Sequence, residues 1–161
     1  MLIEKKMADI FICHYKAIMT LLNGGVEPDG LQAYTSLRHV LFDKIDEIEV
    51  EIIGTVGSEF VSSIKSGIFG KFVYLKKYKN GYILQNIGTG KYYQASGLTT
   101  RLEEIVTEYS VVDTAIIPYA DTLVCDGLFL SHGVSVGKNM ATEIRKGYWD
   151  AKRSGELLIN A

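Results

Sequence analysis

Residues 72–87 read FVYLKKYKNGYILQNI, the pattern of two β-strands joined by a tight turn. Residues 72–78 alternate with a period of two, which is typical of a β-strand with one buried face. Asn80-Gly81 favours a tight hairpin turn, so residues 82–87 are expected to return as a second strand. Gly88-Thr89-Gly90 gives another turn, and residues 91–96 complete a predicted three-stranded antiparallel meander.

The meander lies in a strongly basic segment. Six lysines and one arginine occur between Phe60 and Leu102, with no aspartate or glutamate among them. The whole chain has 17 basic and 19 acidic residues, so this segment has a charge of +7 and the rest of the chain has a charge of −9. Such a local field attracts anions and acidic surfaces.

Helical patterns precede the meander. Apolar residues recur at threes and fours over residues 4–22, and Asn23-Gly24-Gly25 suits a helix end. A second amphipathic helix is predicted from the Asp29 cap to about Glu51, with Gly54 and Gly57 ending it. A short third helix is predicted over 59–66. The first two helices should form a hairpin.

The C-terminal third mixes helices and strands. Thr100 and Glu103 have the spacing of a capping box, which predicts a helix after residue 100. Residues 114–119 and 123–128 are expected to form a second hairpin, in which Pro118 indicates an edge position. A last helix is predicted over 139–154. The chain should therefore be a single α+β domain over 1–161, with an N-terminal helical hairpin, an antiparallel sheet and a C-terminal helix.

Composition limits the class of protein. A chain of 161 residues with 47% apolar side chains can bury one substantial core. Its longest apolar runs are far shorter than a membrane span, and Asp9 interrupts any signal-peptide core, so a cytoplasmic protein without membrane attachment is expected. Cys13 and Cys125 have no zinc-site or disulfide spacing, and both are expected to be reduced and buried.

Three segments resemble a group of small, uncharacterised bacterial proteins. They are residues 116–128 (IIPYADTLVCDGL), residues 70–76 (GKFVYLK) and His14-Tyr15-Lys16. The likeness covers most of the chain and is looser near residues 138–146. The group has no established activity, so the resemblance implies a bacterial or phage origin and transfers no site residue.

The first candidate site is the meander. In a regular strand Tyr74, Lys76 and Tyr78 would share one face, and Lys77 and Lys79 the other. Rings beside ammonium groups suit a single-stranded nucleic acid or a nucleotide, while the positive charge alone suits an acidic protein surface. The alternative is a solvated sheet whose lysines prevent edge pairing. The pI of about 5.9 argues against a dedicated nucleic-acid binder.

The second candidate site is the glycine-containing segment 133–139. Backbone amides at a helix start bind phosphate or carboxylate, and Lys138 and Asn139 would lie beside them. The spacing differs from that of a nucleotide-hydrolysing phosphate loop, which needs four residues before Gly-Lys and a Ser or Thr after it. A loop that only starts a helix, capped by Asn139, is the favoured interpretation.

Catalytic and metal sites are not predicted. Cys125 and Asp126 are strand neighbours that should point to opposite faces, so they would not join His132 in one catalytic site. His14 and His39 are too few ligands for a metal. We therefore expect no metal, no cofactor and no catalytic residue, although a site assembled from distant residues would not show in one sequence, which leaves the question of an enzyme open.

The sequence favours a non-enzymatic interaction protein. Its basic sheet is expected to recognise an acidic protein surface, through Lys76, Lys77, Lys79, Tyr74 and Tyr78. The alternative is a nucleotide or nucleic-acid binding protein, either a ligand sponge or a nucleotide-handling enzyme, that combines the meander with Lys138 and Asn139. An acidic cluster at residues 43–51 complements the basic segment, so we also expect a homo-oligomer, with a dimer as the simplest form.

Overall fold

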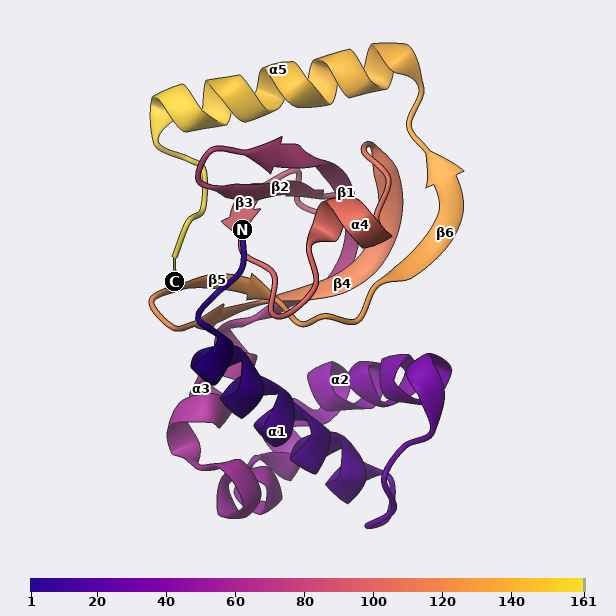
Figure 1. Ribbon diagram of the computed structural model, residues 1–161, viewed down its shortest axis with the longest axis vertical. Coiled ribbons are helices and arrows are strands. Elements are labelled where there is room, and N and C mark those ends of the chain that lie inside the picture. The colour runs from indigo at the N-terminus through magenta and orange to yellow at the C-terminus, as the bar shows by residue number, and fades with distance from the viewer. Residues whose placement is uncertain (161) are drawn as a thin grey trace. The chain divides into compact units, whose positions relative to one another are not determined.

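The computed structural model describes residues 1–160 and divides the chain into two compact units. One unit is residues 4–67, and the other is residues 1–3 together with residues 68 onward. The first is helical and the second combines a curled antiparallel sheet with a C-terminal helix (Figure 1). The predicted α+β class is confirmed.

The helical unit contains α1 (Lys5–Leu22), α2 (Gly30–Val56) and α3 (Ser58–Ser66). α2 packs against both α1 and α3, so the predicted hairpin is present. Asp29 precedes α2 as expected, but α2 continues through Gly54 and ends at Gly57. Gly57 has φ +90°, a conformation that glycine adopts without a Cβ penalty, whereas Gly54 keeps helical geometry. The buried residues of this unit include Phe11, Ile18, Met19, Leu41, Ile52, Phe60 and Ile64.

The second unit is a curled sheet that closes into a barrel. Its strands are β1 (Ile68–Tyr78), β2 (Gly81–Asn86), β3 (Tyr92–Ala95), β4 (Ser110–Tyr119), β5 (Thr122–Cys125) and β6 (Leu130–Ser135). The order β3-β2-β1-β4-β5 is antiparallel throughout, and β6 pairs with β4 beside β5. Because β4 lies next to β1 after a three-strand meander, the arrangement is a Greek key.

Two segments cover the outer edge of β3 and complete the closure. The Ser96 amide donates to the Leu123 carbonyl (2.8 Å), and the Cys125 amide donates to the Ser96 carbonyl (2.9 Å). Nearer the start of β3, Leu158 of the C-terminal tail exchanges backbone hydrogen bonds with Tyr92 and Gln94. The edge of β3 is therefore covered by the tail, and Ser96, directly after β3, bridges the sheet to β5.

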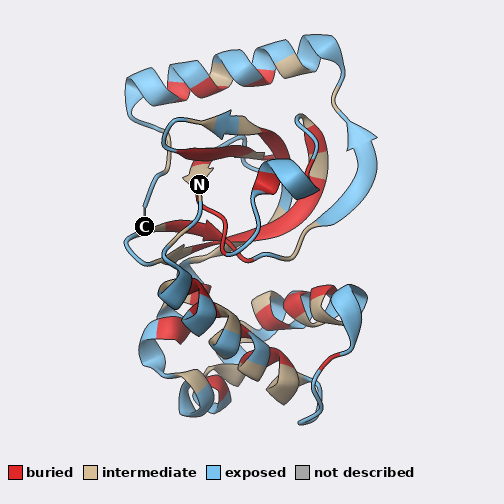
Figure 2. Cartoon of the chain, viewed as in Figure 1, coloured by how far each residue is buried: buried red, intermediate tan, exposed pale blue. Residues whose placement is uncertain are grey.

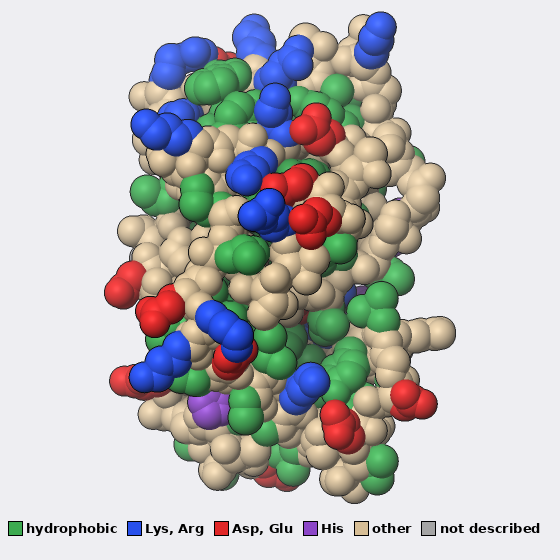
Figure 3. Space-filling view, viewed as in Figure 1, with side chains coloured by type: hydrophobic (Ala, Val, Ile, Leu, Met, Phe, Trp, Pro, Cys, Tyr) green, Lys and Arg blue, Asp and Glu red, His purple; other side chains and the backbone are tan. Residues whose placement is uncertain are grey.

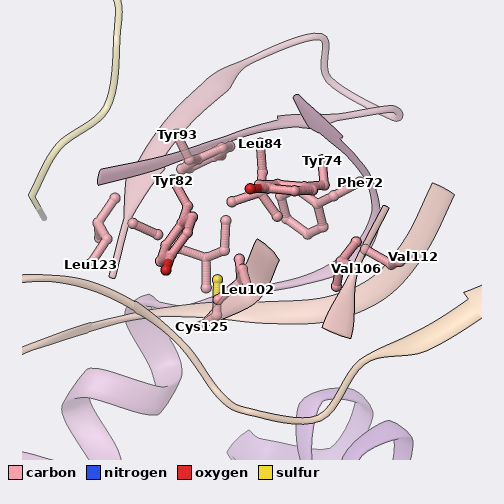
Figure 4. Packing of buried hydrophobic residues seen from close by; sticks show 12 residues of the cluster. Phe72, Tyr74, Tyr82, Leu84, Tyr93, Leu102, Val106, Val112, Leu123 and Cys125 are labelled. Carbon is pink, nitrogen blue, oxygen red and sulfur yellow. The ribbon is translucent and has the colours of Figure 1, made fainter. Parts of the chain in front are cut away.

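A β-bulge divides β1 into two registers. Tyr74 pairs with Leu84, but Lys76 pairs with Ile83, so one residue of β1 is extra at this point. Before the bulge, Phe72 and Tyr74 point into the barrel interior, where Figure 4 shows them with Tyr82 and Cys125. After it, Tyr78 packs on the outer face. Tyr74 and Tyr78 therefore lie on opposite faces, and the prediction that they share one is wrong.

Helix α5 (Lys138–Ser154) covers the outer face of the meander. Its buried residues Ile144, Tyr148 and Ala151 pack on Val73, Leu75, Ile83 and Tyr92, and Figure 2 shows this buried stripe facing the sheet. The contact is close at Gly147, where an added Cβ would collide with the Tyr92 hydroxyl. That hydroxyl donates a buried hydrogen bond to the Ile144 carbonyl (2.7 Å).

Several local expectations are wrong. The helix after residue 100 is a single turn, α4 (Leu102–Ile105), whose N-cap is Arg101 with no side-chain cap bond, so the capping box is not formed. The strand expected over 123–128 ends at Cys125. Cys13 is exposed, although Cys125 is buried as expected. Strand β6 was not predicted, because all six of its residues are exposed and show no apolar alternation.

Within residues 1–160, none of the helices combines the length and the apolar character needed to cross a membrane.

Candidate anion-binding surface

The predicted meander residues do not form one surface. Tyr74 is fully buried, so its ring belongs to the barrel core and cannot offer contact area to a partner. Burial, with Glu103 and Glu108 nearby, also raises the pKa of Tyr74, which keeps its hydroxyl neutral. Lys79 is exposed at the β1–β2 turn. Lys76 and Tyr78 remain at the outer surface beside α5.

Lys77 is engaged in an ionic cluster with Glu103. Its Nζ lies 3.2 Å from Glu103 Oε1, while the Tyr82 hydroxyl donates to Glu103 Oε2 at 2.5 Å. The hydrogen bond from Tyr82, with further help from Lys77, lowers the pKa of Glu103 from 4.5 to about 2. Burial and the same carboxylate raise the pKa of Tyr82 to about 12. Lys77 thus joins α4 to β1, and part of its charge is neutralised.

This cluster predicts a pH-dependent contribution to stability. Because the folded-state pKa of Glu103 is depressed, its ionised form stabilises the fold fully above about pH 4.5, and this contribution is lost as the pH falls toward about 2. Glu103→Gln should therefore lower the melting temperature at pH 7, with a difference from the parent that shrinks across that window. Glu104→Gln, at the exposed neighbour, is the control. A Glu103→Gln effect that stayed constant with pH would contradict the assignment.

A group of side chains where β1 meets α5 forms the best candidate surface. We call it the aromatic–cationic patch, and it consists of Lys76, Tyr78, Arg145, Trp149 and Lys152. The Tyr78 ring stacks on Tyr148 of α5, with centroids 4.8 Å apart, and meets Trp149 edge-on at 5.6 Å. Lys76 Nζ lies 5.5 Å from the Tyr78 centroid, and Lys152 Nζ lies 5.2 Å from the Trp149 centroid. Both distances are within the range of a cation–π contact.

Among the described residues, the cations of the patch have no ion-pair partner, although Glu108 is near enough to Tyr78 to act on its pKa in the opposite sense to Arg145. Burial is the main cause that raises the pKa of Tyr78, and Arg145 lies near enough to the phenol to oppose this rise. Within residues 1–160, Lys76, Arg145 and Lys152 form no ion pair, whereas the neighbouring Arg153 pairs with Asp150. Trp149 is 38% exposed, so part of its ring is open to a partner. Figure 3 shows lysine and arginine side chains gathered over α5 at the top of the view.

Sequence reasoning missed the contribution of α5 to this patch. Arg145, Trp149 and Lys152 are separated by four and then three residues, a spacing that places them on one helix face. That spacing, around the only tryptophan of the chain, was the available signal. Nothing in the sequence showed that this face would lie beside Tyr78, because the pairing depends on the bulge in β1.

Lys138 and Asn139 lie elsewhere on α5. They occupy its first turn and are exposed. The N-cap is Gly137, so the prediction that Asn139 caps this helix is wrong. At 1.5 Å per residue, Lys138 lies about 16 Å along the helix axis from Trp149. The two candidate sites predicted from the sequence are therefore separate surfaces.

The cysteine, aspartate and histidine weighed for catalysis are not assembled. Cys125 is completely buried in the barrel core, and this burial raises the pKa of its thiol, which disfavours the nucleophilic thiolate. Asp126 accepts hydrogen bonds from Thr114 (3.4 Å) and from the Leu128 amide (3.0 Å). His132 pairs with a different carboxylate, Asp113, at 2.7 Å.

Other sites are equally separate from the patch. His14 packs beside Phe60, with ring centroids 5.1 Å apart, and within residues 1–160 no three His, Cys, Asp or Glu side chains gather as metal ligands. A cavity of about 200 Å³ lies between α4 and β6, and one of about 410 Å³ lies between the β2–β3 turn and α5. Neither is lined by a residue of the patch.

Comparisons with known proteins return no match, whether to a protein-family profile, to a curated protein or to a solved structure.

Proposed function

We propose that the protein is a non-enzymatic interaction protein that binds an acidic protein surface through the aromatic–cationic patch. The observation that carries the proposal is the placement of three unpaired cations, Lys76, Arg145 and Lys152, around the rings of Tyr78 and Trp149. Tryptophan, tyrosine and arginine are the residues that contribute most often to protein–protein binding energy. The cations supply attraction to carboxylates and the rings supply area from which water is excluded.

The arrangement of the rings favours a protein partner over a stacked base. Tyr78 already stacks on Tyr148 and lies under Lys76, and the Trp149 ring lies under Lys152. A base would have to displace a lysine to stack on Tyr78 or on the covered face of Trp149. Carboxylates need no such displacement, because they can meet the ammonium and guanidinium groups at the rim.

A nucleotide or nucleic acid is the second candidate. The OB-fold, a five-stranded Greek-key barrel, binds oligonucleotides on the outer face of its strands, although this is an analogy of architecture alone. In this chain α5 occupies the outer face of β1, β2 and β3, so that mode would require the helix to leave. The Gly137-Lys138 helix start, the other part of the nucleotide hypothesis, is remote from the patch.

Trp149 allows a direct test, since it is the only tryptophan in the chain and lies within the patch. A glutamate-rich peptide should change the emission of Trp149 on binding. The affinity should fall steeply with salt, because exposed charges are screened over about 8 Å at physiological ionic strength. The Lys76→Glu/Arg145→Glu/Lys152→Glu variant should lose binding by about tenfold or more.

A charge-matched control separates the patch from net charge. Lys71→Glu/Lys91→Glu/Arg101→Glu removes three exposed cations outside the patch and should bind the peptide nearly as well as the parent. Equal losses in the two triple variants would overturn the proposal. Tighter, saturable binding of a nucleoside triphosphate or a single-stranded oligonucleotide, lost in Lys138→Glu, would support the second candidate instead.

A further inference from the structure

Resting on the proposed function, we infer that the acidic partner of the aromatic–cationic patch is a second copy of this chain. The surface that would dock there is an acidic stripe on α2, formed by Asp43, Glu47, Val50 and Glu51. The barrel unit carries 11 basic and 9 acidic side chains, and the helical unit carries 6 basic and 10 acidic ones. The two units therefore have opposite net charge, as expected for surfaces that meet between molecules.

The acidic stripe is exposed and has no ionic partner of its own. Within residues 1–160, Asp43, Glu47 and Glu51 form no ion pair, whereas Asp46 and Glu49 are held by Lys65 of α3 at 3.5 and 3.0 Å. Val50 is 84% exposed, the highest fraction among the large apolar side chains that are exposed. A single exposed valine is normal on a protein surface, so the stripe is distinguished by its three unpaired carboxylates, and Val50 adds a small apolar area between them.

The spacing of the charges on the two helices matches. On α5, Arg145 and Lys152 are seven residues apart, or about 10 Å along the axis, with Trp149 between them. On α2, Asp43 and Glu51 are eight residues apart, or about 12 Å, with Glu47 and Val50 between them. Two helices lying side by side would pair each terminal cation with a carboxylate and place Trp149 opposite Glu47, with Val50 about 4–5 Å along the axis from Trp149, which is within one helical turn. The contact then combines charge pairs with a small apolar contribution from Val50 and Trp149.

Such a contact joins two different surfaces, so its copies can be combined in more than one way. Two molecules that each offer a patch to the other's stripe form a closed dimer, whereas contacts that do not close extend the assembly. In both cases the association depends on the same charge pairs and weakens as salt rises.

Charge exchange provides the test, read by sedimentation velocity at micromolar protein and low salt. The patch variant Lys76→Glu/Arg145→Glu/Lys152→Glu and the stripe variant Asp43→Lys/Glu47→Lys/Glu51→Lys should each be monomeric alone. Mixing the two should restore association, because every stripe then meets a patch of opposite sign. The Glu4→Lys/Glu27→Lys/Glu59→Lys variant reverses three exposed acids outside the stripe and should associate as the parent does.

The outcomes separate this inference from the proposed function. A parent protein that stays monomeric at low salt, yet binds the glutamate-rich peptide with a change in Trp149 emission, keeps the proposed function and overturns the second copy as partner. Mixed variants that remain monomeric while both retain the parent's melting temperature also overturn it. If the Lys71→Glu/Lys91→Glu/Arg101→Glu control loses peptide binding as fully as the patch variant does, while the parent protein still self-associates, the proposed function is removed and only an interface between copies remains.

Discussion

Gly147→Ala should destabilise the barrel unit, although alanine is normally the better residue within a helix. At this position the new Cβ would collide with the Tyr92 hydroxyl and lie 3.1 Å from Tyr92 Cζ. The ring cannot move freely, because its hydroxyl donates a buried hydrogen bond to the Ile144 carbonyl. Overpacking costs about 1–3 kcal/mol, and loss of the buried hydrogen bond costs about the same again. We expect a net loss of about 2–4 kcal/mol in the free energy of unfolding, measured by denaturant titration.

Two further variants make this expectation specific. Tyr92→Phe removes the colliding oxygen, so the Gly147→Ala/Tyr92→Phe double variant should be less destabilised than the sum of the single variants. Gly54→Ala is the matched control, since Gly54 also lies within a helix but has open space around its Cα. It should stabilise the protein by up to about 1 kcal/mol. A stabilising Gly147→Ala would show that α5 does not pack on Tyr92 as described.

The strands of the meander could be predicted from sequence because local chemistry specifies them. Period-two alternation and the Asn80-Gly81 turn depend only on neighbouring residues, so β2 is found within one residue of its expected bounds and β1 ends where expected, although it begins at Ile68, four residues earlier than predicted. The bulge between Tyr74 and Lys76 leaves no comparable signal. It depends on how β1 pairs with β2 while curling into a barrel, and one extra residue reverses the face of every side chain beyond it.

The candidate site shows the same limit. The basic segment was visible as a count of charges, but a count does not say which lysines will be paired. Lys77 meets Glu103 of α4, and α5 covers the sheet face on which a ligand was expected. Arg145, Trp149 and Lys152 replace them at the surface, although they lie far along the chain from the meander. Which side chains form the candidate surface is therefore determined by long-range packing. The local sequence pattern predicted only the strand that carries two of them, Lys76 and Tyr78.

Substitutions of Tyr74 should have the second large effect on stability, because removing the ring and removing only the hydroxyl should change the free energy of unfolding very differently. The ring is fully buried between β-strands in the barrel core, so Tyr74→Ala should cost about 3–5 kcal/mol in the free energy of unfolding. The hydroxyl is also buried, and it has no hydrogen-bond partner among residues 1–160. An unpaired buried hydroxyl gains nothing on folding, so Tyr74→Phe should leave stability within about 1 kcal/mol of the parent or raise it.

Tyr82→Phe is the comparison that tests this reasoning, since the two tyrosines lie in the same core with ring centroids 6.2 Å apart. The Tyr82 hydroxyl donates to ionised Glu103, and hydrogen bonds to charged groups contribute about 1.5–3 kcal/mol. Tyr82→Phe should therefore be clearly more destabilising than Tyr74→Phe at pH 7, as measured by denaturant titration. A Tyr74→Ala variant with the parent's stability would instead place that ring at the surface, where the sequence pattern alone had put it.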